Sequence, residues 1–323
     1  MKSNDWAIQT TNLTRRFRNL TAVAGMNLSV RRGEIFGLVG PDGAGKTTTI
    51  RMLCGIMDAS EGSARVAGFD TIREPELVKR HIGYMAQRFN LYGDLSVAEN
   101  LDFYADVYQV RGQERRERKE RLLQFAQLSD FRKRRAAQLS GGMQKKLALA
   151  CTLIHQPEVI FLDEPTTGVD PASRREFWDI LTELHLQGIT IFVSTPYMDE
   201  AERCSRVGLM YRGQIIVCDA PDRIRGSVTG DLLEVRPSDL RRAEGIVTRL
   251  AGVLEVQTYG DLLHVFVDSA SEREGSLLAA LEAAGIKVMS LRQTRPRMEE
   301  AFISLMRKQT GDTASLQGLP IAE

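Results

Sequence analysis

The stretch that decides the fold is the run of eight residues Gly40-Pro41-Asp42-Gly43-Ala44-Gly45-Lys46-Thr47. It fits the phosphate-binding pattern G-x-x-x-x-G-K-[ST]. The apolar run Ile35–Val39 precedes it and predicts a buried strand, and the apolar-periodic segment Thr47–Ile56 predicts a helix after it. Because strand, loop and helix form the context in which this pattern holds phosphate, a chance glycine-rich turn is the weaker interpretation.

Each residue type in this loop has a task in binding the phosphates of a nucleotide. Glycines allow successive backbone N–H groups to converge on phosphate oxygens, and the N-terminus of the following helix adds its dipole. Lys46 would reach the β- and γ-phosphates, and the Thr47 hydroxyl would bind Mg²⁺. We therefore expect residues 40–47, with Thr48 after them, to hold ATP and Mg²⁺.

A second apolar run, Val159–Leu162, ends in the two carboxylates Asp163 and Glu164. Consecutive side chains alternate along a strand, but the chain turns where the strand ends, so both carboxylates can face one site. Asp163 is suited to hold Mg²⁺ through water, and Glu164 to act as the general base that polarises an attacking water. Two acidic residues at a strand end are usually only solvated, but the phosphate loop upstream favours the catalytic interpretation.

Composition and charge exclude several classes of protein. The chain has 323 residues, and 43 Lys and Arg against 42 Asp and Glu give a formal charge of +1, which disfavours a dedicated nucleic-acid binder. No apolar run approaches the roughly 18 residues that cross a bilayer, and the first ten residues lack the apolar core of a signal peptide. The four scattered cysteines contain no CxxC pair that would indicate zinc or a disulfide framework. We therefore expect a cytoplasmic chain that binds no nucleic acid.

The pattern outside the two motifs predicts an α/β fold. Residues 6–36 alternate apolar and polar side chains, which predicts short antiparallel strands, and residues 96–155 have a helical pattern. Three further strands are expected at Val159–Leu162, Ile189–Val193 and Val207–Tyr211. Helical stretches separate them, which predicts a mostly parallel sheet covered by helices. We expect a P-loop NTPase domain over residues 1–225, with an N-terminal antiparallel β subdomain and a helical insertion at about 96–155.

The pattern changes after Pro221. From Asp231 onward the expected elements follow the order β-α-β-β-α-β, which is that of a ferredoxin-like sandwich, and a last helix is expected at Met298–Met306. We place a domain boundary near 221–230. We also expect a C-terminal accessory α+β domain over residues 230–308 and a flexible tail over 309–323.

Further motifs resemble those of one family. Leu139-Ser140-Gly141-Gly142-Met143-Gln144 resembles the signature motif of the ATP-binding cassette (ABC) ATPases. Gln87 is similar to the family's glutamine loop, Gly168-Val169-Asp170-Pro171 to its D-loop, and Phe17 falls where an aromatic side chain usually stacks on adenine. A core position is the other interpretation of Phe17. The motifs keep the family's order and cover residues 6–225.

The C-terminal part, with its closing segment Met298-Glu299-Glu300-Ala301-Phe302, resembles the accessory domain of cassettes from bacterial drug and multidrug export systems. The resemblance implies head-to-tail pairs of cassettes that enclose two ATP molecules. Ser140 and the amides of Gly141 and Gly142 would meet the γ-phosphate bound to the partner cassette. Gln87 would sense the nucleotide and couple it to a separate integral-membrane permease. The implied catalytic residues are Lys46, Gln87 and Glu164, and the implied metal-binding residues are Thr47, Gln87 and Asp163.

One position departs from the family's pattern. Pro196 stands where the family places a histidine that touches the γ-phosphate. Proline offers neither a side-chain donor nor a backbone N–H, and the loss of one such contact typically costs about 10²–10³ in rate. A site built on Lys46, Asp163 and Glu164 is thus expected to bind ATP and hydrolyse it poorly. This favours a heterodimer with a second, sound cassette, and leaves open a homodimer in which Glu164 alone suffices.

Three alternative functions are weighed against this one. A DNA-repair or chromosome cassette carries a long coiled coil or zinc modules between phosphate loop and signature, but Thr47 and Ser140 lie 93 positions apart with neither feature between them. A translation-type factor usually carries two cassettes in one chain, whereas the motifs in this sequence form one cassette, which disfavours this alternative. An ATP-binding regulatory subunit is supported by Pro196 and opposed by Glu164. We therefore expect the ATPase subunit of an exporter of drugs or other hydrophobic small molecules, peripheral on the cytoplasmic face of the membrane.

Overall fold

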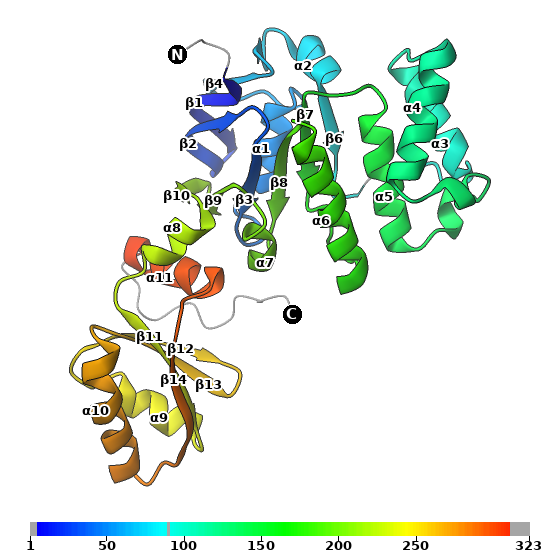
Figure 1. Ribbon diagram of the computed structural model, residues 1–323. Helices are drawn as coiled ribbons and strands as arrows, with labels where there is room; N and C mark the ends of the chain where they lie inside the picture. Colours follow the sequence, from blue (N-terminus) through cyan, green and yellow to red (C-terminus); the bar gives the residue numbers. More distant parts are fainter. Residues whose placement is uncertain (1–4, 89–90, 311–323) are drawn as a thin grey trace. The chain divides into compact units, whose positions relative to one another are not determined.

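The computed structural model describes residues 5–88 and 91–310. The chain divides into two compact units between Cys218 and Asp219, a few residues before the boundary expected near 221–230 (Figure 1). Within the described ranges, no helix is long and apolar enough to cross a membrane.

A six-stranded sheet with the order β10-β9-β3-β8-β7-β6 forms the centre of the first unit. Its strands are β3 (Ile35–Val39), β6 (Ile82–Met85), β7 (Val159–Asp163), β8 (Thr190–Thr195), β9 (Arg206–Tyr211) and β10 (Gln214–Asp219). β3 pairs in parallel with β8 and β9, and β7 pairs in parallel with β6 and β8. Every residue of β3, β7 and β8 is buried, as expected for parallel strands that are covered on both faces. The mostly parallel sheet predicted from the sequence is confirmed.

Four helices pack around this sheet, and α6 has the clearest start signal in the sequence. These helices are α1 (Lys46–Leu53), α2 (Pro75–His81), α6 (Pro171–Leu186) and α7 (Met198–Ala201). Before α6, the carboxylate of Asp170 accepts hydrogen bonds from the N–H groups of Ala172 and Ser173, and Pro171 occupies the first helical position. The buried face of α6 includes Trp178, which is 1% exposed. α7 has only four residues.

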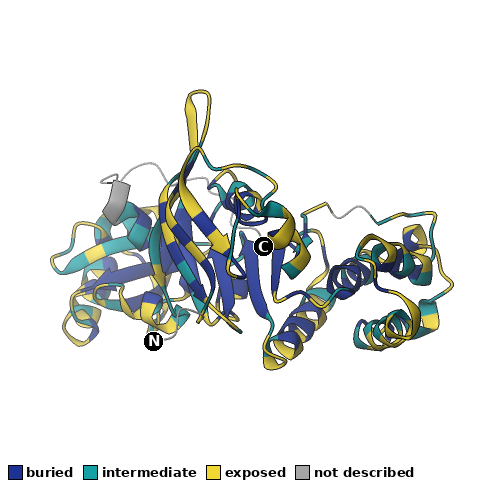
Figure 2. Ribbon diagram, turned by 90° about the horizontal axis from the view of Figure 1, so that it is seen from above, coloured by how far each residue is buried: buried dark blue, intermediate teal, exposed yellow. Residues whose placement is uncertain are grey.

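An antiparallel sheet with the order β2-β1-β4-β5 forms the N-terminal β subdomain. Its strands are β1 (Trp6–Phe17), β2 (Leu20–Arg31), β4 (Glu61–Val66) and β5 (Phe69–Asp70). Their inward side chains share one apolar cluster with Leu38 of β3 and Ile50 of α1. Buried residues accordingly concentrate on the strands in Figure 2. This shared core positions the loop after β3.

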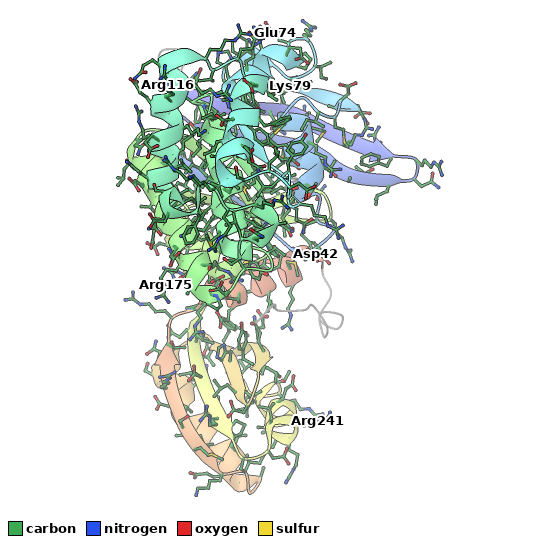
Figure 3. The ribbon with its side chains drawn as sticks, turned by 90° about the vertical axis from the view of Figure 1, so that its right-hand side faces the viewer. Asp42, Glu74, Lys79, Arg116, Arg175 and Arg241 are labelled. Atoms are coloured by element: carbon green, nitrogen blue, oxygen red, sulfur yellow. The ribbon has the colours of Figure 1, made fainter. Side chains whose placement is uncertain are left out.

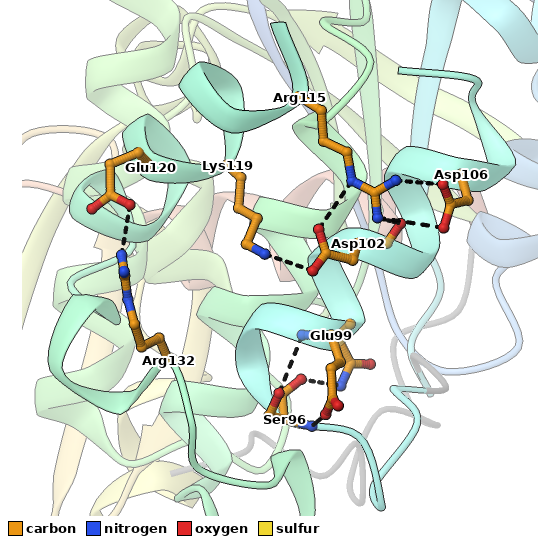
Figure 4. Close-up of polar contacts among 9 residues, drawn as sticks. Ser96, Glu99, Asp102, Asp106, Arg115, Lys119, Glu120 and Arg132 are labelled. Carbon is orange, nitrogen blue, oxygen red and sulfur yellow. Dashed lines mark hydrogen bonds and ion pairs between the residues drawn. The ribbon is translucent and has the colours of Figure 1, made fainter. Parts of the chain in front are cut away.

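The helical insertion is confirmed as α3 (Val97–Val107), α4 (Gly112–Phe125) and α5 (Gly141–Leu153), with 3-10 turns at Ser129–Phe131 and Ala136–Gln138. Ser96 and Glu99 form a capping box at the start of α3. Ion pairs join α3 to the basic α4: Arg115 contacts Asp102 and Asp106, and Lys119 lies 2.6 Å from Asp102 (Figure 4). Part of the positive charge of this segment is therefore neutralised within the subdomain.

The second unit contains an antiparallel sheet with the order β12-β13-β11-β14. In chain order the unit consists of α8 (Pro221–Gly226), β11 (Asp231–Pro237), α9 (Leu240–Val247), β12 (Val253–Tyr259), β13 (Leu262–Val267), α10 (Ala270–Ala283), β14 (Val288–Thr294) and α11 (Met298–Thr310). The order and pairing are those of a ferredoxin-like sandwich. Residues 309 and 310 of the expected tail belong to α11, and residues 311–323 lie outside the described residues.

Candidate nucleotide site

The loop of residues 40–47 leaves the end of β3 and enters α1. A Cβ on Gly40 would lie 2.1 Å from the carbonyl oxygen of Met210, and one on Gly45 would lie 2.3 Å from that of Ala22. Gly45 also has a φ of 111°. Because backbone approaches on two sides leave no room for a side chain, these glycines are required by the fold of the loop. Asp42, labelled in Figure 3, is exposed on this loop.

The side chain of Lys46 is held across the loop. Its ammonium donates hydrogen bonds to the carbonyl oxygens of Gly40 at 2.8 Å and of Pro41 at 3.1 Å, and it lies 3.3 Å from Glu164 Oε1. Lys46 is only 4% exposed. The ammonium thus sits at the loop where the sequence places the phosphates, beside the expected base.

The two carboxylates lie at the end of β7, where the chain turns. Asp163 Oδ1 accepts hydrogen bonds from Thr47 Oγ1 at 3.1 Å and from Ser194 Oγ at 2.7 Å. Glu164 follows with a φ of 48°, a left-handed conformation that is uncommon outside glycine. This turn lets both carboxylates face the loop, as their position at a strand end suggested.

Gln87 follows β6 and reaches the same carboxylate as Lys46. Its amide nitrogen donates to Glu164 Oε2 at 2.8 Å, and Thr167 Oγ1 lies 3.4 Å from that oxygen. The structure therefore brings Lys46, Gln87 and Glu164 together, although they are up to 118 positions apart in the sequence. A carboxylate oriented in this way is suited to hold a water for attack.

Sequence analysis missed Ser194. The strand register places Ser194 of β8 directly beside Asp163 of β7. Its hydroxyl donates to Asp163 and accepts a hydrogen bond from the Glu164 N–H at 3.2 Å. One buried hydroxyl thereby holds the carboxylate of Asp163 and the backbone of Glu164. Only the pairing of β7 with β8 could have revealed it.

Pro196 lies directly after the last residue of β8. The N–H of Tyr197 donates to Thr195 Oγ1 at 3.0 Å, and the Arg174 guanidinium lies 4.1 Å from the centre of the Tyr197 ring. The four histidines, all within the described ranges, lie in other parts of the fold: His81 in α2, His155 against Tyr108, His185 in α6 and His264 in β13.

The signature residues open α5. Ser140 is its N-cap, and the Ser140 hydroxyl accepts a hydrogen bond from the N–H of Met143 at 3.3 Å. A Cβ on Gly142 would lie 2.5 Å from Ser173 Oγ of α6, whereas one on Gly141 would meet open space. These contacts of Ser140 and Gly142 are with α5 and α6, and neither is with the loop of residues 40–47.

Phe17 ends β1 and is 38% exposed, so the interpretation as a core residue is wrong. The guanidinium of Arg15 lies 4.7 Å from the centre of its ring. An exposed aromatic ring at a strand end is suited to stack on a planar base.

The oxygen atoms at Thr47 and Asp163 fit Mg²⁺. The two side-chain oxygens are 3.1 Å apart, and hard cations of this size prefer hydroxyl and carboxylate oxygens. Burial raises the pKa of the Cys54 thiol, and it raises the pKa of Tyr84 to about 12. The negative charge of Asp163 nearby is the second cause of both increases. No group of three or more His, Cys, Asp or Glu side chains within the described ranges could hold a metal alone. An ion here would complete its shell with phosphate and water oxygens.

These features define a P-loop nucleotide-binding cassette, and comparisons identify its family. The model of the family described as "ABC transporter" matches residues 23–167. The probable multidrug ABC transporter ATP-binding protein YbhF of Escherichia coli (strain K12) is 43% identical over 224 residues, which are 69% of this chain and 39% of that relative. The daunorubicin resistance ATP-binding protein DrrA3 of Streptomyces coeruleorubidus is 34% identical over 95% of this chain and 97% of its own length.

Solved structures agree. An ATP-binding cassette of an ABC transporter in its ADP conformation is 27% identical with a TM-score of 0.61, and covers 68% of this chain and 92% of its own. A dimeric cassette in a post-hydrolysis state, bound to ADP and Pi, is 27% identical with a TM-score of 0.60 over 66% of this chain and 98% of its own. The chain belongs to the family of ABC transporter ATP-binding proteins.

Proposed function

We propose that this chain binds and hydrolyses Mg-ATP as the peripheral, cytoplasmic-face subunit of an ABC exporter. ATP-dependent dimerisation would drive a separate integral-membrane permease that moves drugs or other hydrophobic small molecules. The observation that carries the proposal is the convergence of Lys46 and Gln87 on Glu164, beside Thr47 and Asp163. Relatives named for resistance to daunorubicin and linearmycin support the class of cargo.

The residues of the loop would bind the phosphates. Lys46 would exchange the carbonyl oxygens of Gly40 and Pro41 for β- and γ-phosphate oxygens, because charged oxygens are the stronger partners for an ammonium. The N-terminus of α1, with Thr47 and Thr48, would add hydrogen-bond donors and the helix dipole. Phe17 would stack on the adenine. When bound, Mg²⁺ would neutralise part of the phosphate charge.

Glu164 would act as the general base. Gln87 would hold the carboxylate so that one oxygen accepts a proton from the attacking water. Ser194 would keep Asp163 turned toward Thr47, where both belong to the metal site. Ser140, Gly141 and Gly142 would present the start of α5 to the ATP of the partner cassette, where a helix N-terminus stabilises negative charge.

We also propose a heterodimer, in which this chain's own site hydrolyses ATP poorly and a second cassette supplies a sound one. Pro196 carries this proposal, since it lies one residue beyond β8 and provides no hydrogen-bond donor.

Steady-state ATP hydrolysis by the purified chain tests both proposals. The wild-type rate is compared with that of Pro196→His, with Glu164→Gln as the blank and Pro196→Ala as the control that removes proline without adding an imidazole. We expect a wild-type rate near the blank and a gain of about 10²–10³ from histidine only. A wild-type rate well above the blank that histidine does not raise would instead establish a homodimeric motor.

A further inference from the structure

Two adjacent lysines of α5 have different environments. Lys146 Nζ lies 2.6 Å from Glu176 Oε2 of α6 and 3.2 Å from Gln127 Oε1, so its charge is paired with a carboxylate. Lys145 Nζ instead donates to the backbone carbonyl of Gln87 at 3.1 Å. Within the part of the chain that the structure describes, no carboxylate forms an ion pair with Lys145. Lys146 therefore attaches α5 to α6, and Lys145 has a different partner and a different task.

Gln87 is held at both of its ends. Its carbonyl accepts from Lys145, and its side-chain amide donates to Glu164 Oε2 at 2.8 Å. Two consecutive hydrogen bonds thus connect α5, the helix that the signature opens, to the expected catalytic base. A displacement of the Gln87 backbone when its side chain changes partner would be felt directly by the ammonium of Lys145.

A surface pocket lies beside Lys145, between α5 and the glutamine loop. A cavity of about 250 Å³ is lined by Gln87, Gly141, Lys145 and, from the segment after the base, Gly168 and Val169. Because side chains do not fill this pocket, the hydrogen bond of Lys145 to the Gln87 carbonyl is a direct connection beside it between α5 and the glutamine loop.

We infer that Lys145 is a positioning residue that couples the glutamine loop to the signature helix. Through it, the change at Gln87 that accompanies nucleotide binding would set the position of α5, and so the surface offered to the partner cassette. This inference rests on the proposed binding of ATP at the site of Lys46 and Glu164. The inference goes beyond that function by identifying Lys145 as the residue that transmits nucleotide binding from the glutamine loop to α5.

The test is amide hydrogen exchange of the full chain with Mg²⁺ and a non-hydrolysable ATP analogue. The exchange of peptides covering residues 82–88 and 141–153 is followed as the analogue is titrated. In the wild type, both segments are expected to gain protection with the same midpoint. In Lys145→Met, which keeps the length but has no donor, residues 82–88 should still respond and the response of residues 141–153 should be lost. Lys145→Arg, which keeps donors, should restore it.

Controls separate coupling from other effects. Lys133→Met removes a positive charge from an exposed position of the helical subdomain and should leave both responses unchanged. Lys145→Ala, which also has no side-chain donor, is the second variant if Lys145→Met does not fold. The inference is overturned if the variants keep the coupled response, if Lys145→Arg fails to restore it, or if the two wild-type segments respond with separate midpoints. Failure of a fluorescent ATP analogue to bind the wild type would overturn the proposed function along with it.

Discussion

Each unit contains a polar cluster around buried charged side chains, and the two clusters are built differently. In the first unit, Lys46, Gln87 and Glu164 meet beside the loop of residues 40–47. In the second unit, a polar row crosses all four strands of the sheet. Its members are Gln257 of β12, His264 of β13, Glu234 of β11 and Arg292 of β14, each directly opposite the next. Glu300 of α11 adds a carboxylate 2.9 Å from His264 Nδ1.

The two clusters differ in where their residues lie along the strands. Glu164 and Gln87 lie just past the ends of β7 and β6, where the chain leaves the sheet, and the Lys46–Glu164 contact is loose at 3.3 Å. The row in the second unit lies mid-strand, and Glu300, from the helix packed there, is only 1% exposed. Polar groups at strand ends can turn to a ligand. In mid-strand, Glu234 is paired with Arg292 and His264 with Glu300, so these charges already have partners within the second unit.

Each unit also has an aromatic residue at the end of a strand, Tyr259 in β12 and Phe17 in β1, and the two rings differ in their contacts. The Tyr259 ring stacks on His264 with ring centres 5.2 Å apart and 9° between the planes. Phe17, at the end of β1, leaves 38% of its surface exposed. If this contrast is correct, substitutions in the first cluster should affect nucleotide chemistry, and substitutions in the second should affect stability.

The largest effect is expected for Glu164→Gln in the Pro196→His variant. Loss of the general base should lower ATP turnover by about 10²–10⁴, and ATP-bound dimers should accumulate, as measured by size-exclusion chromatography with Mg-ATP. Thr167→Val, which removes only a hydroxyl 3.4 Å from Glu164, is the matched control and should lower turnover far less. Unchanged turnover in Glu164→Gln would refute the assignment of the base.

A smaller effect, on stability, is expected for Glu300→Gln. Replacing this carboxylate removes the charged partner of His264 and should lower the free energy of unfolding by about 1–3 kcal/mol. Binding of a fluorescent ATP analogue should stay the same. Urea unfolding at pH 7 measures the loss, and Glu274→Gln, an exposed carboxylate of α10, is the control. A change in nucleotide affinity would contradict the separation of the two clusters.

As the pH falls, the free energy of unfolding should decrease less in Glu300→Gln than in the wild type. Burial alone would raise the pKa of Glu300, but its contacts with His264 and with the N–H groups of Glu300 and Arg297 bring the pKa below its usual 4.5. The unfolded chain therefore binds the proton first as pH falls, so the stabilisation by Glu300 is present above about pH 4.5 and is lost as pH falls through the folded pKa. Unfolding measured from pH 6 to 3 should show a steeper loss in the wild type than in Glu300→Gln. Equal slopes would count against this role of Glu300.

The smallest effect is expected for Phe17→Ala. Loss of stacking on the adenine should weaken ATP binding by about tenfold, since aromatic stacking on a base contributes roughly 1–3 kcal/mol. Stability should change little because the ring is partly exposed. Leu20→Ala, also exposed and on the neighbouring strand, is the control, and titration of a fluorescent ATP analogue measures both. An affinity equal to that of the wild type would remove Phe17 from the site.

Sequence analysis predicted the elements that local patterns encode. Continuous apolar runs marked β3 and β7, and the order of strands and helices after Asp231 gave the sandwich of the second unit. It did not predict β6 (Ile82–Met85) or β10 (Gln214–Asp219), because β6 is only four residues long and contains Gly83, and most residues of β10 are only partly buried. Neither strand carries a strong local signal of its own.

The sequence by itself determined the phosphate loop and the acidic strand end, because these are short motifs whose chemistry depends on neighbouring residues. The departure at Pro196 came from setting the sequence beside the pattern of the family that it resembles. Only the tertiary structure showed three contacts: the Ser194 hydroxyl donates to Asp163, the Lys145 ammonium donates to the carbonyl of Gln87, and the Glu300 carboxylate lies beside His264 in the second sheet. These contacts join residues from different elements. Strand register and helix packing bring them together, and no local pattern records either one.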